Sequence, residues 1–247
     1  MRLSDCIVCR FFEERVDLKK IWSSENLNKS AYTRLLEERG AFWQFDGDHE
    51  KPHVRSNDEY CVDGYVDFAV LFNTPPLVDF FAEKLKLKLK EVLEGVKVTR
   101  IIGTPGYGAL LAHDLARLMD SKSGAPDKDI SSQTGMSWRE ETIFPGENVL
   151  QVETLAATAL DLKRVKRTLD RDNLYPINWL PYVAVLFVPS FVGSLAFSKK
   201  REFIFLSELD MRVWYSDLCP LCAAGSESLV FEDQRDRFKE DRKTIYL

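Results

Sequence analysis

The sequence feature that most limits the fold is a regular alternation of short apolar runs with longer amphipathic runs. Residues 77–95 place apolar side chains at helical spacing with lysines outside, and residues 96–103 follow as a short apolar run. The later runs are helical at 107–120 and 158–172 and strand-like at 137–144, 148–153, 182–188 and 202–207. Strands that alternate with helices of this length are typical of a mostly parallel sheet covered by helices on both faces. The sequence therefore predicts an α/β fold.

Two segments precede this alternation. The first is a helix that is capped by Asn28 or Ser30 and ends near Gly40, which are the usual polar start and glycine stop. The second segment, 40–72, mixes aromatic and turn-forming residues, and its alternation around residues 65–69 predicts short strands. We expect the second segment to form a hood, or lid, beside the main sheet.

Residues 119–136 have a different character from the rest of the chain. They are rich in Ser, Gly, Lys and Asp and show no apolar period, so we expect a mobile surface loop. The predicted division of the chain is an N-terminal helical segment (1–40), the hood (41–76), the core (77–225) and a charged C-terminal tail (226–247).

The net charge and the distribution of apolar residues limit which kinds of partner the protein is expected to bind. The chain has 247 residues and a net charge of −5, and a nucleic-acid-binding surface is usually basic. No apolar stretch approaches the roughly 20 residues of a membrane span, and charges come too early in the first residues for a signal peptide. We expect a cytoplasmic protein that binds neither nucleic acid nor a membrane.

Residues 147–165 contain the first candidate site. An apolar run ends in an acid and small residues, which predicts a strand, a tight loop and the start of a helix. Many α/β proteins hold a phosphate at such a place, because the helix N-terminus offers free amides. Ala159 and Leu160 stand where glycines would be expected, since glycine lets the backbone approach a phosphate closely.

Four stretches in order along the chain resemble the orotate phosphoribosyltransferases, a branch of the type I phosphoribosyltransferases. Residues 59–72 are similar to the hood of that family, and residues 101–116 are similar to its glycine-bearing loop. Residues 146–161 align with the stretch that binds the ribose 5-phosphate of phosphoribosyl diphosphate, and residues 206–225 are similar to the C-terminal end of one subset. The resemblance covers roughly residues 40–225 and implies the type I fold.

The resemblance also implies a homodimer, Mg²⁺ as the cofactor if the chain is active, and a set of substrate-binding residues. Transfer of ribose phosphate requires a phosphate cradle, acids at the ribose hydroxyls, a metal ion and a lid that excludes water. Glu153 and Thr154 align with the acidic pair. The cradle corresponds to Ala157, Thr158, Ala159, Leu160 and Asp161, and the diphosphate loop to Thr104, Pro105, Gly106, Tyr107 and Gly108.

The phosphate stretch departs from the family pattern. The family has Glu-Asp where this chain has Glu153 and Thr154, so a hydroxyl replaces one carboxylate. Asp161 in the first turn of a helix would repel a phosphate that approaches the same amides. Thr158 and Asp161 also match a capping box, in which side chains satisfy the free amides. The sequence predicts that the chain has capped its own phosphate site; the alternative is an ordinary cap of any α/β protein.

Two other features of this region leave alternatives open. The glycine loop 103–108 offers amides to a diphosphate or serves packing between a strand and a helix. Lys122, Lys128 and Arg139 lie in or after the expected mobile loop, where relatives carry basic residues that contact the diphosphate. Their alternative role is that of solvated surface side chains.

The cysteines suggest a metal site. Cys6 and Cys9 form one Cys-x-x-Cys pair and Cys219 and Cys222 form another, and two such pairs make a closed structural zinc site if the two ends of the chain meet. The alternative is four reduced thiols. We assign no catalytic role to Cys61, and we expect the three histidines, His49, His53 and His113, to be surface or hydrogen-bonded residues, with His53 also a candidate for a base pocket.

The leading functional hypothesis is an orotate phosphoribosyltransferase-like pseudoenzyme. Its donor site has diverged, and it is non-catalytic or of altered specificity and binds a nucleotide-like ligand or a protein partner. The alternative is an active enzyme of pyrimidine nucleotide metabolism that transfers ribose 5-phosphate from phosphoribosyl diphosphate to a base such as orotate. A third hypothesis is a structural scaffold without a ligand.

Overall fold

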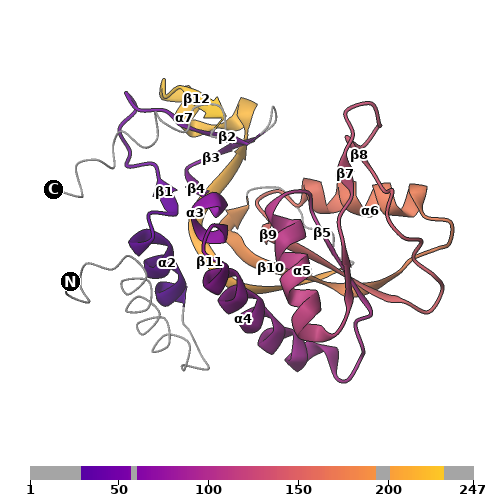
Figure 1. The fold of residues 1–247 in the computed structure, drawn as a ribbon. Coiled ribbons are helices and arrows are strands. Elements are labelled where there is room, and N and C mark those ends of the chain that lie inside the picture. The colour runs from indigo at the N-terminus through magenta and orange to yellow at the C-terminus, as the bar shows by residue number, and fades with distance from the viewer. Residues whose placement is uncertain (1–28, 57–59, 193–200, 231–247) are drawn as a thin grey trace, which may run out of the picture.

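The core of the protein is a curved eight-stranded sheet (Figure 1). The structure is a computed structural model, and it describes residues 29–56, 60–192 and 201–230. The strands lie in the order β12 (Ser228–Val230), β2 (His53–Ser56), β3 (Tyr60–Val62), β11 (Glu202–Tyr215), β10 (Asn178–Val192), β9 (Asn148–Leu155), β5 (Arg100–Gly103) and β6 (Lys122–Gly124). From β11 to β6 all neighbours are parallel, whereas β3 runs antiparallel to both β2 and β11. The prediction of a mostly parallel sheet is confirmed.

Helices cover both faces of this sheet. On β10, Ala184 and Leu186 pack into the large core under α2 (Lys29–Glu38), α3 (Phe68–Phe72), α4 (Pro75–Leu93) and α5 (Tyr107–Met119). Val183 and Val185 point to the other face and pack with Leu162 of α6 (Leu160–Asp172). Parallel strands buried on both faces carry continuous apolar runs. Helices α4, α5 and α6 lie where the apolar spacing predicts them.

The hood is divided between two sheets. β1 (Phe42–Gln44) pairs with β4 (Gly64–Val66) as a separate antiparallel ribbon, whereas β2 and β3 extend the main sheet. The prediction of strand at residues 65–69 is wrong in its second half, because α3 begins at Phe68. Asp67 accepts a hydrogen bond from the amide of Ala69 (3.1 Å) and so caps this short helix. Of the two N-terminal cap candidates, Asn28 lies outside the described residues and Ser30 lies within α2.

The predicted mobile loop contains short strands. β6 joins the edge of the main sheet, and β7 (Asp127–Lys128) pairs with β8 (Met136–Ser137) as a small hairpin. The Thr134 hydroxyl lies 2.7 Å from that of Thr168, which attaches the hairpin to α6. Residues 137–144 were expected to form a strand, but only their first residue belongs to β8. Their apolar side chains, Trp138 and Ile143, are buried against the α6 face of the sheet instead.

The C-terminal part of the described chain returns to the hood. After β11, a short helix α7 (Pro220–Ala223) leads to β12, which pairs in parallel with β2 (Figure 1). Residues 228–230 of the predicted tail therefore form a strand of the sheet, and residues 231–247 lie outside the described residues. None of the helices in the described part of the chain has the length and apolar character needed to span a membrane.

Arg100 in β5 is the largest side chain in the fully buried interior. Its guanidinium donates to Glu147 (2.9 Å), which precedes β9, and to Glu141 (3.2 Å), which also pairs with Lys122. A buried arginine is tolerated when its charge is paired, and removal of one partner leaves the other charge buried and uncompensated. This ion pair therefore joins β5 to the segment that enters β9.

Replacement of Arg100 by alanine should lower the free energy of unfolding by about 3–5 kcal/mol, since it empties the space of a large buried side chain and removes its hydrogen bonds to Glu147 and Glu141. The control is Arg117→Ala, which removes an exposed pair with Asp79 and should cost less than about 1 kcal/mol. Urea denaturation of both variants measures the difference. Equal losses in the two variants would show that the Arg100 pair has no special role.

Candidate functional site

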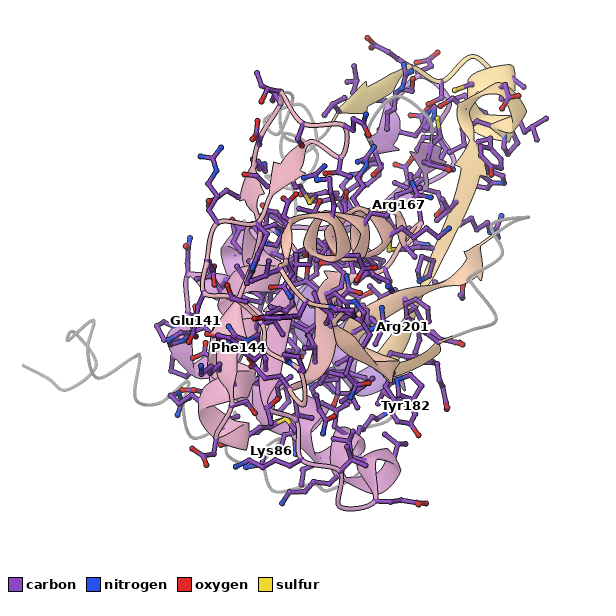
Figure 2. The ribbon with its side chains drawn as sticks, turned by 90° about the vertical axis from the view of Figure 1, so that its right-hand side faces the viewer. Lys86, Glu141, Phe144, Arg167, Tyr182 and Arg201 are labelled. Carbon is purple, nitrogen blue, oxygen red and sulfur yellow. The ribbon has the colours of Figure 1, made fainter. Side chains whose placement is uncertain are left out.

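The candidate site lies at the carboxyl ends of β5 and β9, where turns lead into α5 and α6. Two cavities meet there, one of about 650 Å³ and one of about 120 Å³, and both are lined by Glu153, Leu155 and Asp161. Ligands of open α/β sheets bind at this edge, because the polar ends of helices and strands converge on it. Figure 2 views the molecule from the side of α6, on which Arg167 is labelled.

The smaller cavity is formed by the turn that connects β9 to α6. Ala159 adopts the left-handed conformation (φ 55°, ψ 15°) immediately before the helix begins at Leu160. Within the described part of the chain, the amides of Ala157, Thr158 and Ala159 donate to no protein group. Three successive free amides at a helix N-terminus make a concave site that attracts an anion.

The predicted capping box is wrong. No side chain among the described residues caps the N-terminus of α6, where Ala159 is the N-cap residue. The Thr158 hydroxyl accepts a long hydrogen bond from the amide of Leu160 (3.4 Å), and Asp161 pairs with Arg164 (3.2 Å). A capping box requires the hydroxyl at the N-cap and the acid three residues later. The helix begins one residue too late for Thr158 and Asp161 to meet this requirement.

Leu160 does not have to project over the amides. It and Ala157 pack against the apolar cluster of the hood, which contains Val54 of β2 and Val213 of β11. Leu160, one of the two residues that stand in place of glycine, thus attaches the turn to the hood, whereas Ala159 packs on the α6 face of the sheet. The bulk of Leu160 is accommodated in its contact with the hood, which sequence reasoning did not foresee.

Glu153 is the central acid of the site. Its Oε1 accepts hydrogen bonds from the amide of Thr154 (2.7 Å) and from the Thr154 hydroxyl (3.2 Å), and Thr104 also hydrogen-bonds to its side chain. Burial raises the pKa of Glu153 to about 7, against the opposing effect of these hydrogen bonds, and the nearby charge of Asp161 adds to the rise. A buried acid that titrates near neutrality is characteristic of functional sites.

Thr154 does not line the cavities beside Glu153. Side chains alternate along a strand, so Thr154 points to the opposite face from Glu153 and Leu155, which line both cavities. The structure therefore brings Glu153 together with Asp161, and Thr154 lines neither cavity. The Thr154 hydroxyl binds Glu153 itself.

The glycines of loop 103–108 serve two purposes, which are close packing between β5 and α5 and a backbone conformation that other residues rarely adopt. A Cβ added at Gly103 would lie 2.2 Å from the carbonyl oxygen of Gly108, so these two glycines allow β5 and α5 to pack closely. Gly106 adopts φ 90°, which an L side chain rarely adopts, and a Cβ there would meet nothing within 4 Å. Thr104, Pro105 and Gly108 line the larger cavity. Tyr107 packs on Phe72 of the hood, with ring centroids 5.3 Å apart.

Lys128 and Arg164 supply positive charge to the larger cavity. Of the other basic residues considered, Lys122 pairs with Glu141 and Arg139 pairs with Asp129. Sequence reasoning missed Arg164, although it follows Asp161 by one helical turn and so had to share its helix face. The other lining residues that were missed are Ser56 in the smaller cavity and Ile130, Gln133, Thr134, Gly135 and Met136 in the larger one.

Gln151 holds α6 in place against the site. Its side chain is buried in β9 and donates to the carbonyl oxygen of Leu162 in the first turn of α6 (2.8 Å). Arg201 donates to the Gln151 oxygen (2.6 Å) and to the carbonyl oxygen of Tyr182 (3.0 Å), and Figure 2 labels both Arg201 and Tyr182. These bonds fix the start of α6 relative to the end of β9.

The cysteines predicted to bind zinc lie elsewhere. Cys219 and Cys222 are at the start of α7, beside the hood strands, where their sulfur atoms approach His53 and Cys61. Cys6 and Cys9 lie outside the described residues. Of the two roles expected for His53, the hydrogen-bonded one is confirmed, because its Nδ1 lies 2.9 Å from the Ser226 hydroxyl. The surface position is wrong, since His53 is fully buried in β2 where the C-terminal segment covers it.

Comparison with solved structures places this fold among the phosphoribosyltransferases. The UMP synthase of Leishmania donovani is similar at 15% sequence identity and a TM-score of 0.50, over 85% of this chain and 41% of that chain. An adenine phosphoribosyltransferase is similar at 18% identity and a TM-score of 0.50, over 71% of this chain and 99% of that chain. The chain thus spans less than half the length of the UMP synthase. No family model and no curated protein sequence matches this sequence. The likeness shows that the chain has the type I phosphoribosyltransferase fold.

The raised pKa of Glu153 predicts a pH-dependent stability. An acid whose pKa rises on folding stabilises the protein below its unfolded pKa of 4.5, and this contribution is lost as the pH rises towards about 7. Glu153→Gln keeps the shape without the titration. Its unfolding free energy should differ little from wild type near pH 4.5 and exceed it near pH 8 by on the order of 3 kcal/mol, since one pKa unit corresponds to about 1.4 kcal/mol.

Urea denaturation between pH 4.5 and 8 measures this difference. A Glu91→Gln variant, in which an exposed acid of α4 is replaced, is the control and should keep the pH dependence of the wild type. If Glu153→Gln also follows the wild-type curve at every pH, Glu153 does not titrate in this range.

Proposed function

We propose that this protein binds a nucleotide-like ligand through its ribose 5-phosphate group and does not transfer ribose phosphate from phosphoribosyl diphosphate. It is then an orotate phosphoribosyltransferase-like protein with a diverged donor site. The observation that carries the proposal is the row of three free amides at Ala157, Thr158 and Ala159, before the N-terminus of α6.

The free amides support binding of a phosphate group. Residues 157–161, which include the N-terminus of α6, line the smaller cavity, and its volume of about 120 Å³ suits one compact anionic group. The left-handed Ala159 turns the backbone so that successive N–H groups converge, as in other anion-binding turns. In a scaffold, water would satisfy these donors, as it does at many helix N-termini, so ligand binding has to be measured directly.

The larger cavity supports a ligand that extends beyond the phosphate. Its volume of about 650 Å³ is in the range of small-molecule sites. Glu153 lies where the two cavities meet and can accept a hydrogen bond from a sugar hydroxyl, while Lys128 and Arg164 contribute donors. A sugar phosphate with an attached base fits this sequence of a small anionic site followed by a wider polar one.

The acids of the site argue against catalysis. Transfer from phosphoribosyl diphosphate builds positive charge on the sugar and needs carboxylates and Mg²⁺ to hold the ribose and the diphosphate. Thr154 replaces one of the two acids, and Glu153 is only partly ionised near neutral pH. Asp161 also adds negative charge beside the phosphate position, which disfavours a diphosphate more than a monophosphate.

One observation favours the alternative of an active enzyme. Asp161 lines both cavities together with Glu153, and the two carboxylates interact electrostatically. In this arrangement Asp161 would replace the acid lost at Thr154, and the two carboxylates would hold Mg²⁺. The two functions therefore assign opposite roles to Asp161.

Phosphate binding at the turn can be tested with a charge placed among the amides. Ribose 5-phosphate at a hundredfold excess over its Kd should stabilise the wild type by about 2.7 kcal/mol and raise the melting temperature by several degrees. Thr158→Glu places a carboxylate beside the free amides and should weaken binding at least about tenfold by repulsion. Thr158→Gln, of equal length and without charge, is the control and should bind within about threefold of wild type.

Calorimetric titration of the three proteins with ribose 5-phosphate, and then with nucleoside monophosphates, measures these affinities. If none of these ligands binds to the wild type, the proposed function is refuted and the hypothesis of a scaffold without a ligand is favoured. Equal affinity in the glutamate and glutamine variants would place the phosphate away from this turn.

The two assignments of Asp161 predict opposite outcomes for Asp161→Asn. If the protein only binds its ligand, removal of this charge should tighten ribose 5-phosphate binding by about fivefold, which corresponds to about 1 kcal/mol. Neither wild type nor variant should release diphosphate from phosphoribosyl diphosphate in the presence of Mg²⁺ and orotate, adenine or other bases. Repeated turnover by the wild type that is abolished in Asp161→Asn would establish the active enzyme instead.

A further inference from the structure

A second group of chemically reactive side chains lies at the opposite end of the sheet from β6. His53, Cys61, Cys219 and Cys222 each offer one atom that can bind a metal ion, and these four atoms all lie within 4.8 Å of one another. The residues come from β2, β3 and the start of α7, which lie side by side at the top of Figure 1. His53, Cys61 and Cys219 are buried, and Cys222 is half-buried.

Three of the distances within this His53–Cys61–Cys219–Cys222 cluster match those of a tetrahedral metal site, and the others are within 4.8 Å. Cys61 Sγ and Cys222 Sγ are 3.8 Å apart, and His53 Nε2 lies 3.5 Å from Cys219 Sγ and 3.4 Å from Cys222 Sγ. Zinc bonds of about 2.3 Å to sulfur and about 2.0–2.1 Å to nitrogen, at tetrahedral angles, place two sulfurs about 3.8 Å apart and sulfur and nitrogen about 3.6 Å apart. The side chains are therefore already arranged around the position of an ion.

Hydrogen bonds orient the histidine for metal binding. The Ser226 hydroxyl donates its proton to the carbonyl oxygen of Lys51 (2.8 Å), so it accepts a hydrogen bond from Nδ1 of His53 (2.9 Å). A proton on Nδ1 leaves the lone pair on Nε2, and this atom faces the two sulfurs. A ligand histidine is commonly held in this way by a partner on its other nitrogen.

The backbone explains why these residues meet. Arg55 is opposite Cys61 in the antiparallel pairing of β2 with β3, so His53, two residues earlier, is a diagonal neighbour of Cys61 on the same face. Cys219 and Cys222 lie in a tight Cys-Pro-Leu-Cys turn, in which the amide of Ala223 donates to the carbonyl oxygen of Cys219 (3.1 Å). The pairing of β12 with β2 brings this turn over the hood.

We propose that His53, Cys61, Cys219 and Cys222 bind one Zn²⁺ ion in a closed structural site that ties the hood to the C-terminal segment. Three thiolates and one imidazole complete a tetrahedral set, which leaves no position for a substrate. Cys219 and Cys222 thus keep the role predicted from the sequence. Their partners are a histidine and a cysteine of the hood instead of Cys6 and Cys9.

The metal content of the full-length protein tests this site. Protein purified without chelators should contain about one zinc per chain by elemental analysis, and the zinc should be released on modification of the thiols. Cobalt substituted for zinc should give the visible absorption of a tetrahedral ion with three thiolate ligands. Less than about a tenth of an equivalent of zinc, after refolding with added ZnCl₂, would overturn the proposal. Iron in place of zinc, or a disulfide detected by mass spectrometry among Cys61, Cys219 and Cys222, would also do so.

Two sets of variants identify the ligands. Cys6→Ser combined with Cys9→Ser should keep the full zinc content, whereas Cys61→Ser or His53→Ala should lose most of it. Zinc lost from the Cys6/Cys9 double variant and retained in the other two would refute the assignment. If the Cys61 and His53 variants do not fold, the cobalt spectrum of the Cys6/Cys9 double variant still decides, because it must equal that of the wild type.

Discussion

Burial of both faces of β9 and β10 is the constraint on which the rest of the structure depends. Helices α2 to α5 cover one face and α6 covers the other, so the side chains between the strand ends are mostly apolar, and the buried Gln151 is hydrogen-bonded at both its nitrogen and its oxygen. Polar groups that are free to bind a ligand can lie only where the strands end. Glu153 and the turn 156–159 occupy that edge, beside Thr104 at the end of β5.

At this edge, close packing and electrostatics act together. The contact between Gly103 and Gly108 brings the start of α5 against β5, so that Thr104 is buried beside Glu153, and the same burial raises the pKa of that acid. The free amides of the turn attract an anion while Asp161 opposes it. On the proposed function, this balance suits a ligand with one phosphate, held in a site whose fold is that of the phosphoribosyltransferases.

The zinc ion that we propose at the His53–Cys61–Cys219–Cys222 cluster would stabilise the other end of the sheet. β2, β3 and β12 are short strands that extend far from the large core and share a small apolar cluster. Short edge strands bury little apolar surface, so a metal that joins segments distant in sequence adds stability where packing is limited. The hood also supplies Ser56 to the smaller cavity, so order in β2 bears on the ligand site.

The sequence by itself determined the α/β class and the positions of α4, α5 and α6, because apolar spacing directly reflects which side chains a helix or strand buries. It also located Glu153 and the turn after it. Only the tertiary structure decided that α6 begins at Leu160, since the left-handed Ala159 depends on how Ala157 and Leu160 pack on the hood. Likewise, Cys61 and Cys222 are 161 residues apart, and their contact follows from the pairing of β2 with β3 and β12. Contacts of this kind are set by strand register and chain return, which local patterns of residues do not encode.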